Sequence, residues 1–154
     1  QVGTPLDVYY RPVNVWTSRF VGTHPINLFD IQIEADRPQV HPVDRPDVPL
    51  PMDAERHARL RAAAPDGRVM VGCRPEFVKL KPVNGVAGTA WKGEVFTRQV
   101  LGTSILYDVR SASSHITSVS DAEDQLSVGS NVGVEMLWSR AFFFDKQTEQ
   151  RLEV

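Results

Sequence analysis

The chain has 154 residues, and its 17 Lys and Arg residues nearly balance its 19 Asp and Glu residues, giving a formal net charge of −2. A balance this close to neutral argues against a general nucleic-acid-binding protein, which needs a basic surface. No apolar run approaches the roughly 18 residues of a membrane-spanning helix, and residues 1–11 lack the basic start and apolar centre of a secretory signal. The single cysteine, Cys73, rules out an internal disulfide and fits a reducing compartment.

Residues 1–23 are predicted to form two short helices. Thr4 is a typical N-cap, Pro5 fits the first helical position, and Asp7 completes a start that resembles a capping box. The first helix must end near Arg11, because Pro12 pushes the residue before it out of the α region. A second helix is expected over residues 13–21, with a glycine following it.

These two helices carry more aromatic surface than short elements need. Trp16 and Phe20 are four residues apart and therefore share one helical face, and Tyr9 adds a third ring in the first helix. We expect this face to pack on a larger partner and to remain uncovered when the chain is alone.

The next segment combines a strand, a proline-rich stretch and a third helix. Residues 27–35 alternate as a strand does. Five prolines fall between residues 38 and 51, which predicts an extended connection over residues 36–51 that cannot sit in a central strand. Asp53 is a good N-cap for a helix through residue 64, whose weak apolar face suits a helix that covers a sheet edge.

From residue 68 onward the hydrophobic period is two. Val69, Val71 and Cys73 share one strand face, and Asn84-Gly85 predicts a tight turn. Further strands are expected over residues 91–101, 105–110, 116–119, 132–137 and 142–144. Short strands at such spacing predict a mainly β fold, a small sandwich or barrel.

Motifs for catalysis or metal binding are not found. The sequence has no G-x-x-x-x-G-K-[ST] loop and no G-x-G-x-x-G, so we expect no ATP-binding residue in this chain. The four histidines are scattered without ligand spacing, and Cys73 lies in an apolar alternation that favours a buried thiol over a nucleophile. We therefore expect no catalytic residue, no metal ligand and no cofactor.

Three blocks of sequence resemble one family. Residues 1–12 read QVGTPLDVYYRP, and Phe20-Val21-Gly22 with Asn27 follows them. This block resembles the end of the nucleotide-binding domain of ATP-binding-cassette import ATPases. Residues 72–76, GCRPE, look like the motif that opens the C-terminal regulatory region of these ATPases, the TOBE domain. Gly93 to Gly102, residues 107–110, Gly129 and residues 144–148 are similar to the rest of that region.

The resemblance implies a fold, a division of the chain into two domains and a functional role. The fold would be an OB-like small barrel, with residues 1–23 ending the nucleotide-binding domain and residues 24–154 forming the TOBE domain. The role would be that of a non-catalytic regulatory and dimerisation domain of the ATP-binding subunit of a maltose-type importer for sugars, polyols or glycerol 3-phosphate. The implied partners are a second copy, the upstream ATPase domain, membrane permease subunits and a cytoplasmic regulator, at the inner face of the plasma membrane.

The resemblance also singles out residues. Tyr9, Trp16 and Phe20 are expected to pack against the ATPase domain. The residues of the family motifs, some of which could lie at an interface, are Arg74, Pro75, Glu76, Gly102, Phe144 and Asp145. For Arg74 and Glu76 two interpretations stay open: they sit at a domain or subunit contact, or Pro75 fixes a corner and Arg74 forms a local hydrogen-bonded bridge. Glu149 stands where the family has a glycine, so the sequence of the turn after Asp145 departs from the family pattern.

Two binding modules remain as alternatives. An oligonucleotide-binding barrel would stack bases on aromatic rings beside a basic groove. However, residues 68–154 hold ten Lys and Arg against ten Asp and Glu, and Trp91, Tyr107 and Trp138 lie on or beside apolar strand faces, as core residues do. The other alternative is a site for a small solute, either a sugar or an oxyanion.

Overall fold

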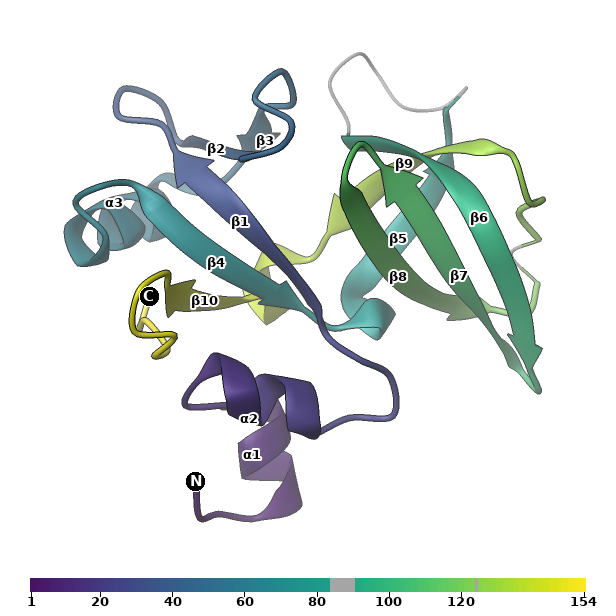
Figure 1. Ribbon diagram of the computed structural model, residues 1–154, viewed down its shortest axis with the longest axis horizontal. Helices are drawn as coiled ribbons and strands as arrows, with labels where there is room; N and C mark the ends of the chain where they lie inside the picture. Colours follow the sequence, from purple (N-terminus) through teal and green to yellow (C-terminus); the bar gives the residue numbers. More distant parts are fainter. Residues whose placement is uncertain (84–90, 124) are drawn as a thin grey trace.

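The computed structural model describes residues 1–83, 91–123 and 125–154 and arranges most of them in two five-stranded sheets (Figure 1). The first sheet has the order β10-β4-β1-β2-β3 and the second the order β5-β9-β6-β7-β8. The first contains β1 (Asn27–Ile33), β2 (Gln39–Pro42), β3 (Leu50–Pro51), β4 (Arg68–Cys73) and β10 (Phe142–Asp145). The second contains β5 (Val78–Pro82), β6 (Trp91–Leu101), β7 (Ser104–Ser111), β8 (Ser114–Asp121) and β9 (Asn131–Met136).

The second sheet curls into a small barrel. Its outer strands β5 and β8 contact each other, and the Ser118 hydroxyl donates a hydrogen bond across this seam to the Val78 carbonyl at 2.7 Å. A bulge between Val95 and Thr97 bends the long strand β6. The interior of the barrel is filled by alternate residues, including Trp91, Val95, Ile105, Tyr107 and Val109. The predicted mainly β class and the predicted strand over residues 91–101 are confirmed.

The proline-rich segment contains more structure than the sequence predicts. β2 and β3 lie within it, in place of an uninterrupted extended connection. The prolines are tolerated because Pro42 is the last residue of β2 and Pro51 the last residue of the edge strand β3, where a missing backbone N–H costs little. The predicted turn at Asn84-Gly85 lies outside the described residues.

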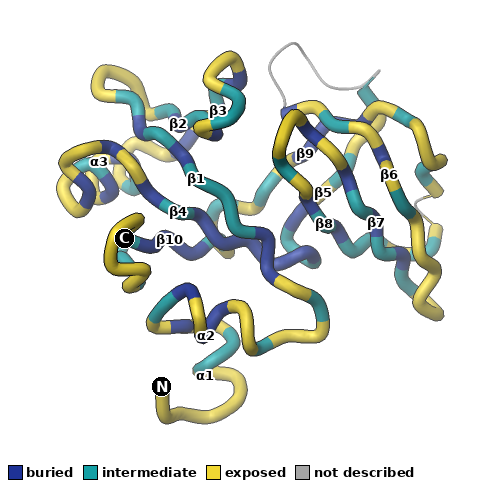
Figure 2. The backbone as a smooth tube through the Cα atoms, in the orientation of Figure 1, coloured by how far each residue is buried: buried dark blue, intermediate teal, exposed yellow. Residues whose placement is uncertain are grey.

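The two N-terminal helices form as their caps predict. In α1 (Pro5–Tyr10) the Thr4 and Asp7 side chains make a reciprocal capping box. α2 (Val15–Phe20) is shorter than predicted, because Asn14 takes the N-cap position and accepts a hydrogen bond from the Thr17 N–H at 2.8 Å. α1 has no buried residue, whereas α2 buries Val15, Thr17 and Ser18 (Figure 2). No helix in the described ranges is long and apolar enough to cross a membrane.

Helix α3 (Ala54–Ala63) begins at Asp53, as predicted, and contacts β1. Its Leu60 is fully buried in the main core, and His57 Nε2 lies 2.8 Å from the Glu34 carbonyl oxygen. The expectation that this helix covers a sheet edge rather than a core is therefore wrong: it contacts the middle strand of the first sheet and adds Leu60 to the core.

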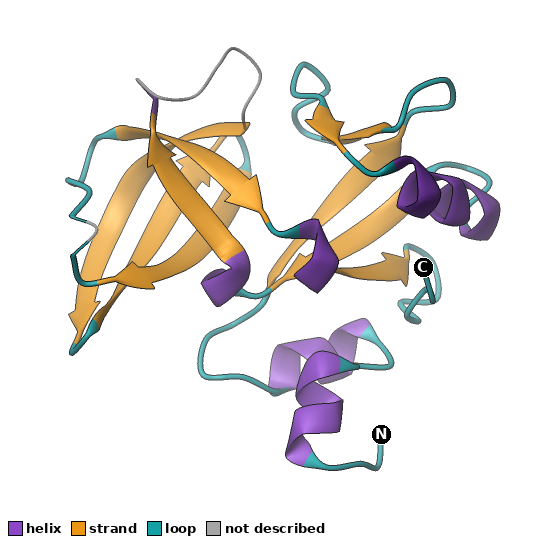
Figure 3. Ribbon diagram, turned by 180° about the vertical axis from the view of Figure 1, so that it is seen from behind, coloured by secondary structure: helices purple, strands orange, loops and turns teal. Residues whose placement is uncertain are grey.

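Two short turns, η1 (Pro75–Phe77) and η3 (Trp138–Arg140), connect the sheets, and Figure 3 shows them in purple where the sheets meet. Asn27 of β1 pairs with the backbone of Thr117 in β8 through two hydrogen bonds of 2.7 and 2.8 Å. The Phe29 ring meets the Trp91 ring edge-on at 5.0 Å. The two sheets thus share one continuous core.

Candidate functional site

The first motif residue, Arg74, joins the end of β4, in the first sheet, to both N-terminal helices. Arg74 follows β4, and its side chain is only 1% exposed. Its Nη2 donates a hydrogen bond to the Tyr9 carbonyl at 2.9 Å, and its Nη1 donates one to the Val21 carbonyl at 2.6 Å. Tyr9 lies in the last turn of α1, and Val21 is the C-cap of α2. One guanidinium therefore satisfies carbonyls at the C-terminal ends of two helices, which attract cations.

The charge of Arg74 is not balanced by a carboxylate. No described Asp or Glu lies within 4.0 Å of its nitrogens, and its buried Nε has no hydrogen-bond partner among the described residues. Burial lowers the pKa of Arg74, and the partial offset comes from Tyr10. The faces of the Tyr9 and Phe142 rings, 3.7 and 5.8 Å from the guanidinium carbon, supply further stabilisation.

The two residues after Arg74 have different surroundings. Pro75 is buried at the start of η1, and Arg74 before it adopts the extended backbone that precedes proline. Glu76 is half-buried beside an open hollow of about 240 Å³ that also touches Tyr9, Gly22 and His24. The Arg74 bridge reaches residues 53 and 65 positions away, so it joins distant segments rather than a single turn.

The other motif residues lie in separate places. Phe144 is fully buried with Val15 of α2, in a small cluster with Ile26 and Phe142. Asp145 closes the next turn, because its Oδ1 accepts hydrogen bonds from Gln147 and Thr148. Gly102 occupies the tip of the β6–β7 hairpin at φ +65° with nothing within 4 Å of a Cβ placed there.

Glu149 adopts the backbone that a glycine would favour. Its φ is +57°, and its carbonyl accepts a hydrogen bond from the Val15 N–H at 3.1 Å. The turn after Asp145 therefore keeps its geometry despite the substitution and holds the start of α2.

An uncovered aromatic face remains on α1 and α2. Trp16 is 66% exposed and Phe20 77% exposed, and their rings stack at 5.3 Å. The expected uncovered face is therefore present at Trp16 and Phe20, whereas Tyr9 is half-buried with its ring against the Arg74 guanidinium. Its other exposed apolar members are Leu6, Tyr10 and Val13.

The aromatic residues of the barrel face inward. Trp91 and Tyr107 are fully buried, and Trp138 packs against the core and stacks with Phe143 at 6.3 Å. Their predicted place in the core is confirmed, which removes Trp91 and Tyr107 as stacking platforms for bases. Cys73 is likewise buried, as predicted, and burial raises the pKa of its thiol to about 12.

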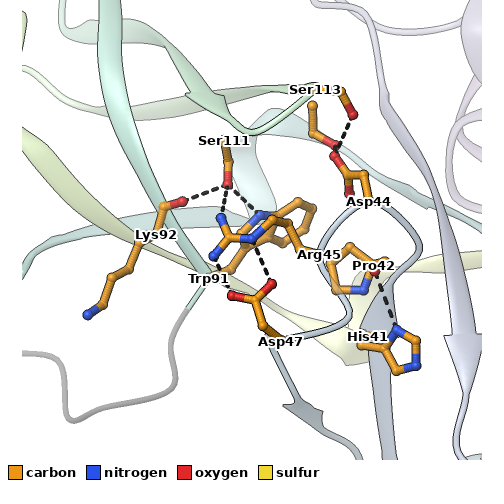
Figure 4. A network of polar contacts seen from close by, with 10 residues as sticks. His41, Pro42, Asp44, Arg45, Asp47, Trp91, Lys92, Ser111 and Ser113 are labelled. Atoms are coloured by element: carbon orange, nitrogen blue, oxygen red, sulfur yellow. Dashed lines mark hydrogen bonds and ion pairs between the residues drawn. The ribbon is translucent and has the colours of Figure 1, made fainter.

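Sequence reasoning missed a polar network between the sheets (Figure 4). The buried Ser111 hydroxyl donates to the Lys92 carbonyl at 2.6 Å and accepts from Trp91 Nε1 at 2.8 Å and Arg45 Nη1 at 3.4 Å. Asp47 pairs with Arg45 and fixes its orientation. No spacing rule could have found this contact, because Arg45 and Ser111 are 66 positions apart.

The sequence is similar to a known domain profile and to several known proteins. The sequence profile of the TOBE domain matches residues 71–144. Over 99% of its length the chain is 26% identical to the sn-glycerol-3-phosphate import ATP-binding protein UgpC 2 of Agrobacterium fabrum, of which it covers 38%. Over 97% of its length it is 24% identical to the multiple sugar-binding transport ATP-binding protein MsmK of Streptococcus mutans, of which it covers 39%. The chain thus spans about two fifths of the length of these curated relatives.

A solved structure shows the same fold. A crystal structure of the cytoplasmic molybdate-binding protein ModG with molybdate bound aligns with a TM-score of 0.59 at 14% sequence identity, covering 76% of this chain and 94% of that one. This likeness confirms the expected OB-like fold.

Proposed function

Because residues 71–144 are a TOBE domain, we propose that this chain is the C-terminal regulatory and dimerisation region of the ATP-binding subunit of an importer. Its relatives over nearly the whole chain are import ATP-binding proteins for glycerol 3-phosphate and sugars. Residues 1–23 are assigned to the end of the ATPase domain and residues 24–154 to the regulatory domain. In this proposal ATP binding and catalysis belong to the ATPase domain and not to this chain.

The observation that carries this proposal is the aromatic face of α1 and α2. Val15 of α2 is buried against Phe142 and Phe144 of β10, whereas Trp16 and Phe20 are exposed. Covering two such rings is worth about 1.5–3 kcal/mol each. An ATPase domain preceding residue 1 would cover them, while Arg74 keeps the helices fixed to the barrel.

The role of the barrel in this proposal is to hold two subunits together. Two-fold pairing of two copies raises the effective concentration of the ATPase domains, so that their closure becomes an intramolecular event. The permease would then place the pair at the inner face of the plasma membrane, where a cytoplasmic regulator could favour the open or the closed state.

Sedimentation velocity of the chain tests the pairing. We expect a dimer at high micromolar concentration, and a monomer throughout that range would contradict the proposed dimerisation.

Paired substitutions test the covering of the aromatic face. Trp16→Ser with Phe20→Ser should leave the stability of this chain unchanged, since both rings are exposed. The same pair in a longer chain that includes the ATPase domain should lower its melting temperature. Val100→Ser, at a 62% exposed position of β6, is the matched control and should change neither. Equal melting temperatures for the long chain with and without the aromatic pair would disprove the packing.

A further inference from the structure

A second feature lies where the two sheets meet. An open hollow of about 440 Å³ is bounded by β1, by the loop after β2 and by the turn between β7 and β8, a volume typical of small-molecule sites. Both sheets contribute walls, and such junctions are where ligands are commonly bound. The lining residues on which the argument rests are Leu28, Phe29, Asp30, Asp44, Ser113 and Ser114.

A carboxylate on the wall is held in place with one oxygen left free. Ser113 and Ser114 both donate hydroxyl hydrogen bonds of 2.8 Å to Oδ2 of Asp44, and Figure 4 shows Ser113 in this contact. Asp44 Oδ1 has no hydrogen-bond partner among the described residues, so it can accept from a ligand. A second carboxylate, Asp30, lies in the same lining and is paired with Lys146 at 2.7 Å.

The apolar part of the lining is fixed as well. Leu28 and Phe29 come from β1, and the Phe29 ring is held by its edge-on contact with the buried Trp91. The hollow therefore presents an apolar surface beside hydrogen-bond acceptors.

The loop that carries Asp44 is anchored to the barrel. Arg45, the next residue, bonds to both Asp47 and the buried Ser111. A site assembled in this way loses little conformational freedom when a ligand enters.

We propose that this hollow binds a neutral polyhydroxylated solute, a sugar or polyol. Hydroxyl groups of such a solute can donate to Asp44 Oδ1, while its C–H face rests on Phe29. Lys146 and Arg45 are already paired with Asp30 and Asp47, so the free oxygen of Asp44 disfavours an anionic solute such as glycerol 3-phosphate. The inference rests on the proposed function, in which the solute inside the cell would regulate its own import by binding to this domain.

Chemical-shift titration of the chain with maltose, glycerol and sn-glycerol 3-phosphate tests the proposal. We expect amide shifts confined to residues 28–30, 43–45 and 111–115 with maltose, a millimolar dissociation constant, and no such shifts with sn-glycerol 3-phosphate. Asp44→Asn keeps an acceptor for the two serines but removes the charge, and should weaken maltose binding roughly tenfold. Asp36→Asn, an exposed aspartate outside the hollow, is the control and should bind as the parent does.

Three outcomes would overturn the inference. They are no shifts with maltose or glycerol at saturating concentration, shifts that map elsewhere, or stronger binding of a cation such as spermidine, which would show that the carboxylates serve an amine. None of them affects the proposed dimerisation, because the oligomeric state is measured separately by sedimentation. A chain that binds maltose but stays monomeric would instead retain the inference and remove the dimer.

Discussion

Arg74 and Tyr9 contact each other twice. The guanidinium carbon lies 3.7 Å from the centroid of the tyrosine ring, and Nη2 of the same guanidinium donates to the tyrosine's own carbonyl at 2.9 Å. The third contact, to Val21, extends the bridge to α2. Both helices are thereby fixed by one side chain to the end of β4, from which the chain passes through η1 into the barrel.

Arg74→Lys should loosen this joint. A lysine ammonium lacks the planar fork that reaches both carbonyls, so one buried acceptor loses its partner. We expect the free energy of unfolding to fall by about 1–3 kcal/mol in urea titrations. Hydrogen exchange should accelerate most over residues 5–21.

The control for this substitution is Arg37→Lys, at an exposed position whose side chain has no hydrogen bond or ion pair among the described contacts. It should change stability by less than about 0.5 kcal/mol. Two results would contradict the role given to Arg74. One is an equally small change in the free energy of unfolding for Arg74→Lys, and the other is an acceleration of hydrogen exchange in the barrel as large as that in residues 5–21.

Gly22 lies beneath the same guanidinium. Its φ is +133°, and a Cβ added there would come within 2.8 Å of Arg74 Nη1, which is held by Val21 and cannot move aside freely. Gly22→Ala should therefore cost about 2–4 kcal/mol, combining backbone strain with the displaced arginine. Gly102→Ala has positive φ but open space, so only the backbone term of about 1 kcal/mol applies. Similar melting temperatures for the two variants would show that Gly22 is not constrained by Arg74.

The lowered pKa of Asp145 predicts that the folded chain becomes less stable in acid. Hydrogen bonds from Thr148, and then from Gln147, lower the pKa of this carboxyl below its ordinary value of 3.8. A pKa lower in the folded state than in the unfolded one gives stability that is present above the unfolded pKa and is lost as the pH falls through the folded pKa, below about pH 4.

Asp145→Asn should flatten this part of the profile, measured as the melting temperature against pH. Asp7 and Asp47, whose pKa values are also lowered by hydrogen bonds from Thr4 and Arg45, should account for part of the remaining decline. Asp36→Asn should keep the parent profile. A parent-like slope in Asp145→Asn would refute the assignment.

Cys73 should be inert in the folded chain. Its thiol is fully buried, and a pKa of about 12 leaves almost no thiolate at mildly alkaline pH. We expect labelling by a disulfide reagent only after urea unfolding, with the labelling midpoint matching the unfolding midpoint. Rapid labelling without denaturant would show that β4 opens locally.

Local chemistry explains which elements could be predicted from the sequence. Thr4, Asp7 and Asp53 act within one helical turn, so the starts of α1 and α3 follow from neighbouring residues. The strand β6 could likewise be predicted, because a strand pattern is read from residues that are adjacent in the sequence. The two strands in the proline-rich segment were missed because β2 forms by pairing with β1 and β3 by pairing with β2, and local composition does not encode either pairing.

The candidate site depends on distant contacts in the same way. The motif pointed to Arg74, but its carbonyl partners at Tyr9 and Val21 are set by the packing of α1 and α2 on the barrel. The hollow beside Asp44 could not be foreseen at all, because its walls come from β1 and from a turn that follows β7. Sequence therefore identified the residue that carries the joint, and only the fold identified what it joins.

Glu149→Gly should stabilise the chain. Glu149 holds φ at +57°, a conformation that costs a residue with a Cβ about 1 kcal/mol, and glycine adopts it freely. The larger freedom of glycine in the unfolded chain offsets part of the gain, so we expect an increase of about 0.5 kcal/mol in the free energy of unfolding. Glu149→Ala removes the same carboxylate but keeps the strain, and should leave stability unchanged. Because the Glu149 carbonyl accepts a hydrogen bond from the Val15 N–H, Glu149→Gly should also slow hydrogen exchange at Val15. An equal increase in the free energy of unfolding in Glu149→Ala would assign the stabilisation to the lost charge instead.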